Sequence, residues 1–267
     1  MSYTIGTTLS ARELILAIID STARPNLSAA YLVRAGALYD IDSRAIRVAI
    51  TRLVKSEALA QVSRGNYGVG RAGRGMHETV VAWSRVEDTV CAWDNSWLAV
   101  YMGHLKRTNK TEVRARERAL RMKGFAGVDS GIWVRPSNLN SNIGELHESL
   151  VSLGLDHSAP ILRIADQHPA GTLAFGSLWD TAELERLYRR RIHELNKSTN
   201  RVVNLSTADA ARETLQLGRA VTHDILVDPL LPEEMLNTAL RREMNHQMRI
   251  YDKLAKSYWR DFYNEAH

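Results

Sequence analysis

The sequence has a single cysteine and no long apolar run. Cys91 stands alone among 267 residues, which excludes an internal disulfide framework and a zinc site built from several cysteines. No apolar stretch reaches the roughly 18 residues that a membrane-spanning helix needs, and the chain does not open on an export signal. These absences predict a soluble protein of the reducing cytoplasm that does not associate with membranes.

Patterns typical of common catalytic and cofactor sites are also missing. There is no Gly-x-Ser-x-Gly elbow and no phosphate-binding loop of the Gly-Lys-Ser/Thr kind. Glu243 and His246 have the spacing of a carboxylate-bridged metal site, but the second Glu-x-x-His that such a site requires is absent. Residues 68–73 match the dinucleotide fingerprint formally, yet no buried strand precedes them, so we interpret 68–75 as a linker. We therefore expect no enzyme activity, no cofactor and no metal site.

One stretch, Ser43–Lys55, is rich in basic residues and contains no acidic one. Apolar residues recur in it at helical spacing and predict a buried face, made of Ile46, Ala49, Ile50 and Leu53. The opposite side carries Arg44, Arg47, Thr51 and Lys55, with Arg52 beside them. Ser43 is expected to cap this helix. A helix that hides one face and presents only positive charge on the other is suited to bind a polyanion, above all nucleic acid.

The surrounding segments predict a winged helix-turn-helix, a module whose third helix enters the major groove while a hairpin lies against the DNA backbone. Helices are expected at 11–20, with Ser10 and Glu13 as a capping box, and at 27–39. Residues 59–69 alternate around an Arg-Gly-Asn turn and predict the hairpin. The candidate DNA-binding residues are therefore Arg44, Arg47, Thr51, Arg52, Lys55, Arg64, Asn66 and Tyr67.

Positive charge is concentrated in the same part of the chain. Residues 1–75 hold ten Lys and Arg against five Asp and Glu, and the remaining 25 basic and 25 acidic residues cancel. The formal excess of +5 therefore lies entirely in the first quarter of the sequence. This concentration of positive charge in residues 1–75 supports nucleic-acid binding more strongly than does the pI near 9.4 of the whole chain.

The rest of the chain predicts two further domains. An apolar strand at 97–102, a charged helix at 110–123 and strands at 127–135 and 159–164 indicate a small ferredoxin-like α+β domain. Helices are then expected over three segments, at 177–196, 207–226 and 232–263. The predicted fold class is α+β, with a winged helix-turn-helix at 1–75, a ferredoxin-like middle domain at 76–165 and a helical domain for effector binding or dimerisation at 166–267.

Several segments, taken in order, resemble one known family. They are Arg44–Val54 in the basic helix, Gly65-Asn66-Tyr67 in the hairpin, Gly131–Pro136 in the middle domain, and Trp179, Leu184, Tyr188 and Asp228–Glu234 in the helical end. In these segments the chain is similar to the PaaX-type repressors, which regulate the bacterial phenylacetate pathway and related aromatic catabolic routes. The similarity extends over nearly the whole chain.

This resemblance implies a homodimeric transcriptional repressor of an aromatic-compound catabolic operon. Such a repressor binds double-stranded DNA at a palindromic operator and is released by a small aromatic effector, an aryl-CoA thioester in well-known members. No motif in the sequence locates the residues that would bind the effector.

Two other classes of protein are compatible with parts of the sequence. A ferredoxin-like domain can belong to a metal-dependent nuclease, in which Asp88, Asp94 and Asp129 would hold Mg²⁺, although these acids form no recognisable metal motif. An architectural DNA-binding protein without regulatory function would use the basic helix alone. That second alternative leaves the neutral C-terminal two-thirds of the chain without a purpose.

Overall fold

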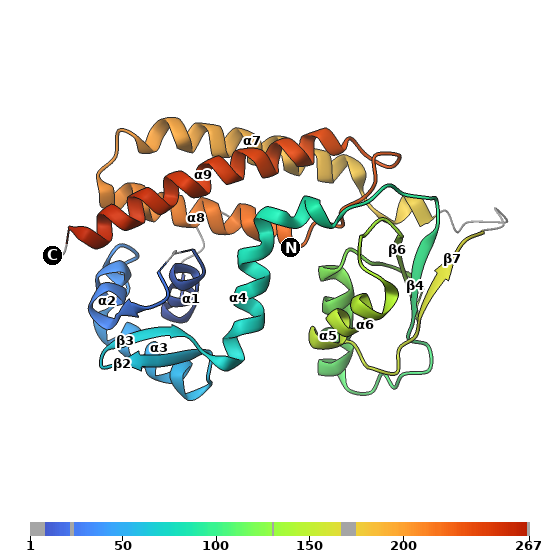
Figure 1. The fold of residues 1–267 in the computed structure, drawn as a ribbon, viewed down its shortest axis with the longest axis horizontal. Coiled ribbons are helices and arrows are strands. Elements are labelled where there is room, and N and C mark those ends of the chain that lie inside the picture. The colour runs from blue at the N-terminus through green and yellow to red at the C-terminus, as the bar shows by residue number, and fades with distance from the viewer. Residues whose placement is uncertain (1–8, 22–23, 130, 167–174, 266–267) are drawn as a thin grey trace. The chain divides into compact units, whose positions relative to one another are not determined.

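The computed structural model describes residues 9–21, 24–129, 131–166 and 175–265, and Figure 1 shows its helices and strands. The mixture of helices with two small antiparallel sheets confirms the α+β class. Contacts between residues divide the chain into two units. Unit 1 comprises Met1–Ser84, Arg190–Asp224 and Glu243–His267, and unit 2 comprises Arg85–Arg189 and Ile225–Arg242.

This division differs from the three consecutive segments expected from the sequence, because each unit is assembled from separated stretches of chain. The long helices are the reason. Helices α7 (Thr181–Val202), α8 (Thr207–Leu226) and α9 (Thr238–Asn264) each contribute residues to both units. The helical character expected for the last third is therefore present, but its residues do not form a unit of their own.

Unit 1 begins with the elements α1 (Ala11–Ser21), β1 (Leu27–Ser28), α2 (Ala29–Ala37), α3 (Ser43–Lys55), β2 (Leu59–Ser63) and β3 (Asn66–Val69). The predicted capping box is present at α1, since the Glu13 amide donates to Ser10 Oγ at 3.2 Å and the Ser10 amide donates to Glu13 Oε2 at 2.9 Å. The three strands form an antiparallel sheet in the order β1-β3-β2.

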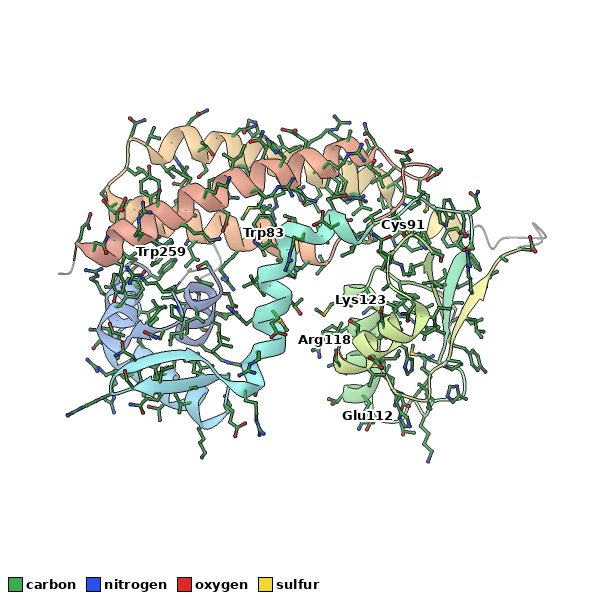
Figure 2. The ribbon with its side chains drawn as sticks, viewed as in Figure 1. Trp83, Cys91, Glu112, Arg118, Lys123 and Trp259 are labelled. Carbon is green, nitrogen blue, oxygen red and sulfur yellow. The ribbon has the colours of Figure 1, made fainter. Side chains whose placement is uncertain are left out.

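The core of this N-terminal part is completed by residues distant in sequence. Side chains from α1, α2 and α3 pack together with Ala211 and Leu215 of α8 and with Trp259 and Phe262 of α9. Figure 2 labels Trp259 near the end of α9. The Trp259 and Phe262 rings lie 6.4 and 6.0 Å from the ring of Tyr31, which belongs to α2. The elements α1 to β3 therefore share their apolar interior with α8 and α9.

The expected linker at 68–75 is instead ordered structure, and this part of the prediction is wrong. A 3₁₀ turn at Arg71–Gly73 leads directly into α4 (Arg74–Val81), which is followed by a second 3₁₀ segment at Ala82–Thr89. A Cβ at Gly70 would lie 2.2 Å from the Glu57 carbonyl oxygen, and one at Gly73 would lie 2.4 Å from that of Ala58. The glycines therefore permit close backbone packing rather than flexibility.

Unit 2 contains the elements β4 (Trp97–Tyr101), α5 (Lys110–Met122), β5 (Ala126–Asp129), β6 (Ile132–Pro136), α6 (Ile143–Ser152) and β7 (Ile161–Ile164). The strands form an antiparallel sheet in the order β5-β6-β4-β7. The single strand expected at 127–135 is a hairpin, and α6 was not anticipated. Residues of α5 and α6 pack on one face of this sheet (Figure 1), where Leu120 and Leu150 join Leu98 and Trp133 in a core.

A buried polar network holds the proline-rich turn of unit 2 between α8 and α9. Asp228 accepts hydrogen bonds from the Tyr188 hydroxyl at 2.6 Å and from the Leu230 amide at 2.7 Å. Arg241 donates to Glu87 at 3.0 Å. Burial raises the pKa of Asp228, while Arg241 opposes that shift. Paired groups of this kind keep the turn in one conformation.

Within the described residues, no helix has both the length and the apolar character to cross a membrane.

Candidate nucleic-acid interface

The start of α3 is fixed by a carboxylate rather than by the expected serine. Asp42 Oδ1 accepts a hydrogen bond from the Arg44 amide at 2.7 Å, and Asp42 has the extended backbone of a capping residue. The prediction of Ser43 as the cap is therefore wrong by one position. An aspartate at this place also interacts favourably with the positive end of the helix dipole.

The apolar face of α3 is buried as predicted. Ile46, Ala49, Ile50 and Leu53 all belong to the core of unit 1. A Cβ at Gly36 of α2 would lie 2.8 Å from Ile46 Cγ1, so the two helices approach more closely there than any other residue would permit. This packing holds α3 in place and fixes the direction of its outer face.

The outer face of α3 carries five of the predicted binding residues, and all five are exposed: Arg44, Arg47, Thr51, Arg52 and Lys55. None of the four basic side chains forms an ion pair with a carboxylate of any residue that the structure describes. The Thr51 hydroxyl donates to the Arg47 carbonyl at 3.0 Å, so its oxygen remains available as an acceptor.

Sequence reasoning missed one member of this surface. Val48 lies on α3 between the basic residues and is 42% exposed. An apolar side chain between arginines suits contact with a thymine methyl group in the major groove. The sequence could have indicated this residue, because Val48 is an apolar residue on the otherwise polar side of the predicted helix.

The hairpin presents Arg64 at its turn, where Gly65 has a φ of 75°. Arg64 is exposed, but the other two hairpin candidates also serve the fold. Asn66 Nδ2 donates to Ser63 Oγ at 3.1 Å and so bridges the turn. Tyr67 is half-buried against the core of unit 1. Of the three hairpin candidates, Arg64 is thus the side chain most available to a ligand.

Some positive charge in the first 75 residues is engaged elsewhere. Arg71 pairs with Glu57 at 3.0 Å. Arg34 lies 4.3 Å from the ring centroid of Phe262 and donates to the Phe262 carbonyl. These contacts are structural. Exposed basic side chains outside such contacts lie on α3, at Arg64, and at Arg12 and Arg74.

The acids considered for a magnesium site have other surroundings. Asp94 accepts hydrogen bonds from the Ser96 hydroxyl and amide, which lower its pKa, and it pairs with Arg163. Asp88 is exposed, and the side chain of Asp129 lies outside the described residues. Among the described side chains, no group of three or more His, Cys, Asp and Glu is arranged to hold a metal ion.

Comparison with solved structures finds a similar fold in the uncharacterized protein Rv0674 from Mycobacterium tuberculosis. The two structures superpose with a TM-score of 0.61 at 20% sequence identity, covering 93% of this chain and 98% of that one. At this identity the likeness shows the fold alone. Comparisons with protein families and with curated proteins give no match.

Proposed function

We propose that this protein is a sequence-specific, double-stranded DNA-binding transcriptional repressor that uses α3 as its recognition helix. The observation that carries the proposal is the outer face of α3, where Arg44, Arg47, Arg52 and Lys55 are exposed and have no carboxylate partner among the described residues. A helix that is held by packing and carries cations without carboxylate partners is suited to bind a polyanion.

The order of elements supports this proposal. The succession α1-β1-α2-α3-β2-β3, with its antiparallel sheet β1-β3-β2, is compatible with the winged helix-turn-helix that the proposal requires. The β4-α5-β5-β6-α6-β7 order of unit 2 is compatible with a ferredoxin-like domain. These are the two modules that the sequence predicts and that the resemblance to PaaX-type repressors implies.

In the complex with DNA, different side chains are expected to contact the bases and the sugar-phosphate backbone. Arg44, Arg47 and Arg52 would donate to the major-groove acceptors of guanine or to phosphates, with Thr51 and Val48 close to the bases. Lys55 and Arg64 would contact the sugar-phosphate backbone, which fixes the register of the protein on DNA without reading sequence.

The regulatory part of the proposal rests on the resemblance to PaaX-type repressors. It comprises a homodimer, a palindromic operator near an aromatic catabolic operon, and release by a small aromatic effector. A two-fold operator requires two recognition helices, one from each protomer. Release requires that the effector bind more tightly to the state that does not bind DNA.

The first test is binding to labelled DNA from upstream of the protein's own gene, with random DNA of equal length as competitor. Arg47→Ala should lower the affinity for the specific fragment by about tenfold to a hundredfold without lowering the thermal stability, because one bidentate contact discriminates by about 1–3 kcal/mol. The matched control is Arg260→Ala, which removes an exposed arginine from α9. Equal affinity of the parent protein for both DNAs would contradict the proposal.

A further inference from the structure

The outer face of α3 contains a row of three small side chains with methyl groups. Ala45, Val48 and Thr51 follow one another at intervals of three residues, a spacing that makes them neighbours along one side of a helix. All three are exposed. These three residues form the methyl ridge of α3.

Packing within the fold does not explain the methyl ridge. Val48 is 42% exposed, whereas the adjacent Ala49 and Ile50 belong to the core of unit 1. Valine and threonine are branched at Cβ, which lowers their tendency to form helices. At exposed positions such residues weaken a helix slightly and are not compensated by burial in the core. Contact with a ligand would supply that compensation.

The one side-chain hydroxyl of the methyl ridge is bonded to the helix itself. Thr51 Oγ1 donates to the Arg47 carbonyl at 3.0 Å. This bond uses the only hydrogen of the hydroxyl, so the side chain has no donor left for a base edge. What Thr51 presents to a ligand is its methyl group and a weak acceptor. The ridge is therefore suited to apolar contact.

Positive charges lie on both sides of the methyl ridge. Arg44 and Arg52 are each four residues from Val48, and both are exposed. Because residues four apart are neighbours on a helix surface, a ligand that reaches Val48 also lies beside these two guanidinium groups. Helix α3 contains no acidic residue. The ligand that fits this face carries negative charge and has apolar groups between its charges.

We infer that the methyl ridge recognises the 5-methyl group of thymine in the major groove, and so distinguishes thymine from uracil. Thymine exposes this group in the groove, and apolar contact with alanine or with the threonine methyl is a common way to recognise it. The inference rests on the proposed function. It adds the chemical feature of DNA that the recognition helix selects.

The dimensions of helix and duplex agree with this inference. Ridge residues three apart are separated by about 4.5 Å along the helix axis, at about 1.5 Å per residue. Neighbouring base pairs are about 3.4 Å apart, and the major groove admits an α-helix. Val48 and Thr51 therefore face different base pairs, and the ridge is long enough to contact methyl groups on two successive pairs.

The test compares duplexes that differ only in these methyl groups. The full-length protein is titrated by fluorescence anisotropy with the specific fragment from upstream of its own gene, and with versions that carry uracil in place of single thymines. At one or two positions uracil should lower the affinity about fourfold, since burial of one methyl-sized group contributes about 0.8 kcal/mol. 5-Bromouracil, whose bromine occupies the place of the methyl group, should restore the affinity.

Combined changes in protein and DNA assign the effect to the methyl ridge. Val48→Ala removes the apolar side chain and favours the helix, so the variant should fold. In this variant, uracil at the sensitive position should no longer lower the affinity. The matched control is Val203→Ala, which shortens a valine that is 64% exposed and lies outside α3. The control should keep the full effect of uracil.

Three results would overturn the inference while the proposed function stands. These are specific DNA binding that uracil weakens at no position, an equal effect of uracil on the parent protein and on Val48→Ala, and a loss that 5-bromouracil does not restore. The last result would assign the loss to a change in DNA shape. Equal affinity of the parent protein for the specific fragment and for random DNA would remove the proposed function and the inference together.

Discussion

Helices α3 and α5 are both 13 residues long and strongly basic, yet their exposed faces differ in two ways. The first difference is charge. Helix α3 contains no acid, whereas α5 contains Glu112 and Glu117, which pair with Arg116 and Arg121 of the same helix. The positive potential of α5 is therefore partly cancelled along its own length.

The second difference is the size of the exposed residues. Between its cations α3 exposes Ala45, Val48 and Thr51, which are short enough to let the helix backbone approach the floor of a groove. The exposed positions of α5 are mostly long charged side chains, including Arg114 and Arg118. Small residues between unpaired cations, rather than the number of cations, distinguish a candidate recognition helix from an ordinary charged surface.

The largest difference between the two helices is expected in DNA affinity when two arginines are removed from each. Arg44→Ala with Arg47→Ala should lower specific DNA affinity by about 2–4 kcal/mol, while Arg114→Ala with Arg118→Ala, an equal loss of charge, should leave it nearly unchanged. Fluorescence anisotropy at one fixed salt concentration measures both. Equal losses from the two double variants would mean that net charge alone governs binding.

Removing the helix caps compares the two helices in stability. Asp42→Ala at α3 and Asn109→Ala at α5 each remove a side chain that accepts hydrogen bonds from first-turn amides. Each should lower the free energy of unfolding by about 1 kcal/mol, as measured in urea. Only the α3 variant should also weaken DNA binding. If Asn109→Ala weakened it equally, α5 would belong to the interface.

A single phosphate contact should be visible in the salt dependence. Arg64→Ala is expected to reduce the slope of log K against log salt by about one, because one fewer counterion is released. The comparison is Arg121→Ala on α5, where the slope should stay constant. Titrations at four or more salt concentrations give both slopes, and an unaltered slope for Arg64→Ala would place the hairpin away from the backbone.

The smallest expected effect concerns Asp156, a carboxylate outside α5 that contacts Arg116 of that helix. Asp156 contacts Arg116 at 3.4 Å, and hydrogen bonds from the Ser158 hydroxyl and amide lower its pKa. Because the folded pKa is lowered, this carboxylate stabilises the fold above its unfolded pKa, and that contribution is lost as the pH falls through the folded value. Ser158→Ala should raise the pKa of Asp156, as followed by carboxyl NMR titration. A pKa that does not move would assign the shift to Arg116.

Local patterns in the sequence predicted local structure well. The capping box at Ser10 and Glu13, the buried face of α3 and the bounds of α8 all follow from side-chain spacing, which acts within a few residues. The candidate binding face of α3 was predicted for the same reason, since exposure follows from the 3.6-residue repeat.

Features that depend on distant partners could not be predicted in this way. The apolar run around Trp133 was interpreted as one strand, although it turns back on itself between β5 and β6. The glycines at 70 and 73 resembled a linker because the carbonyls they pack against are not apparent from the sequence. Trp259 and Phe262 have helical spacing, but that spacing does not reveal that they complete the core around Tyr31.

The shared core of unit 1 has a consequence for how the chain matures on the ribosome. Arg34 and its partner Phe262 are separated by 228 positions, and at about 5–20 residues per second the second follows the first by roughly 10 to 45 seconds. Until α9 is synthesised, the apolar surface of α1, α2 and α3 lacks the part of its core that Trp259 and Phe262 supply. The core shared by α1, α2 and α3 is therefore incomplete until α9 has been synthesised, and this part of unit 1 cannot reach its final packing before translation has passed Phe262.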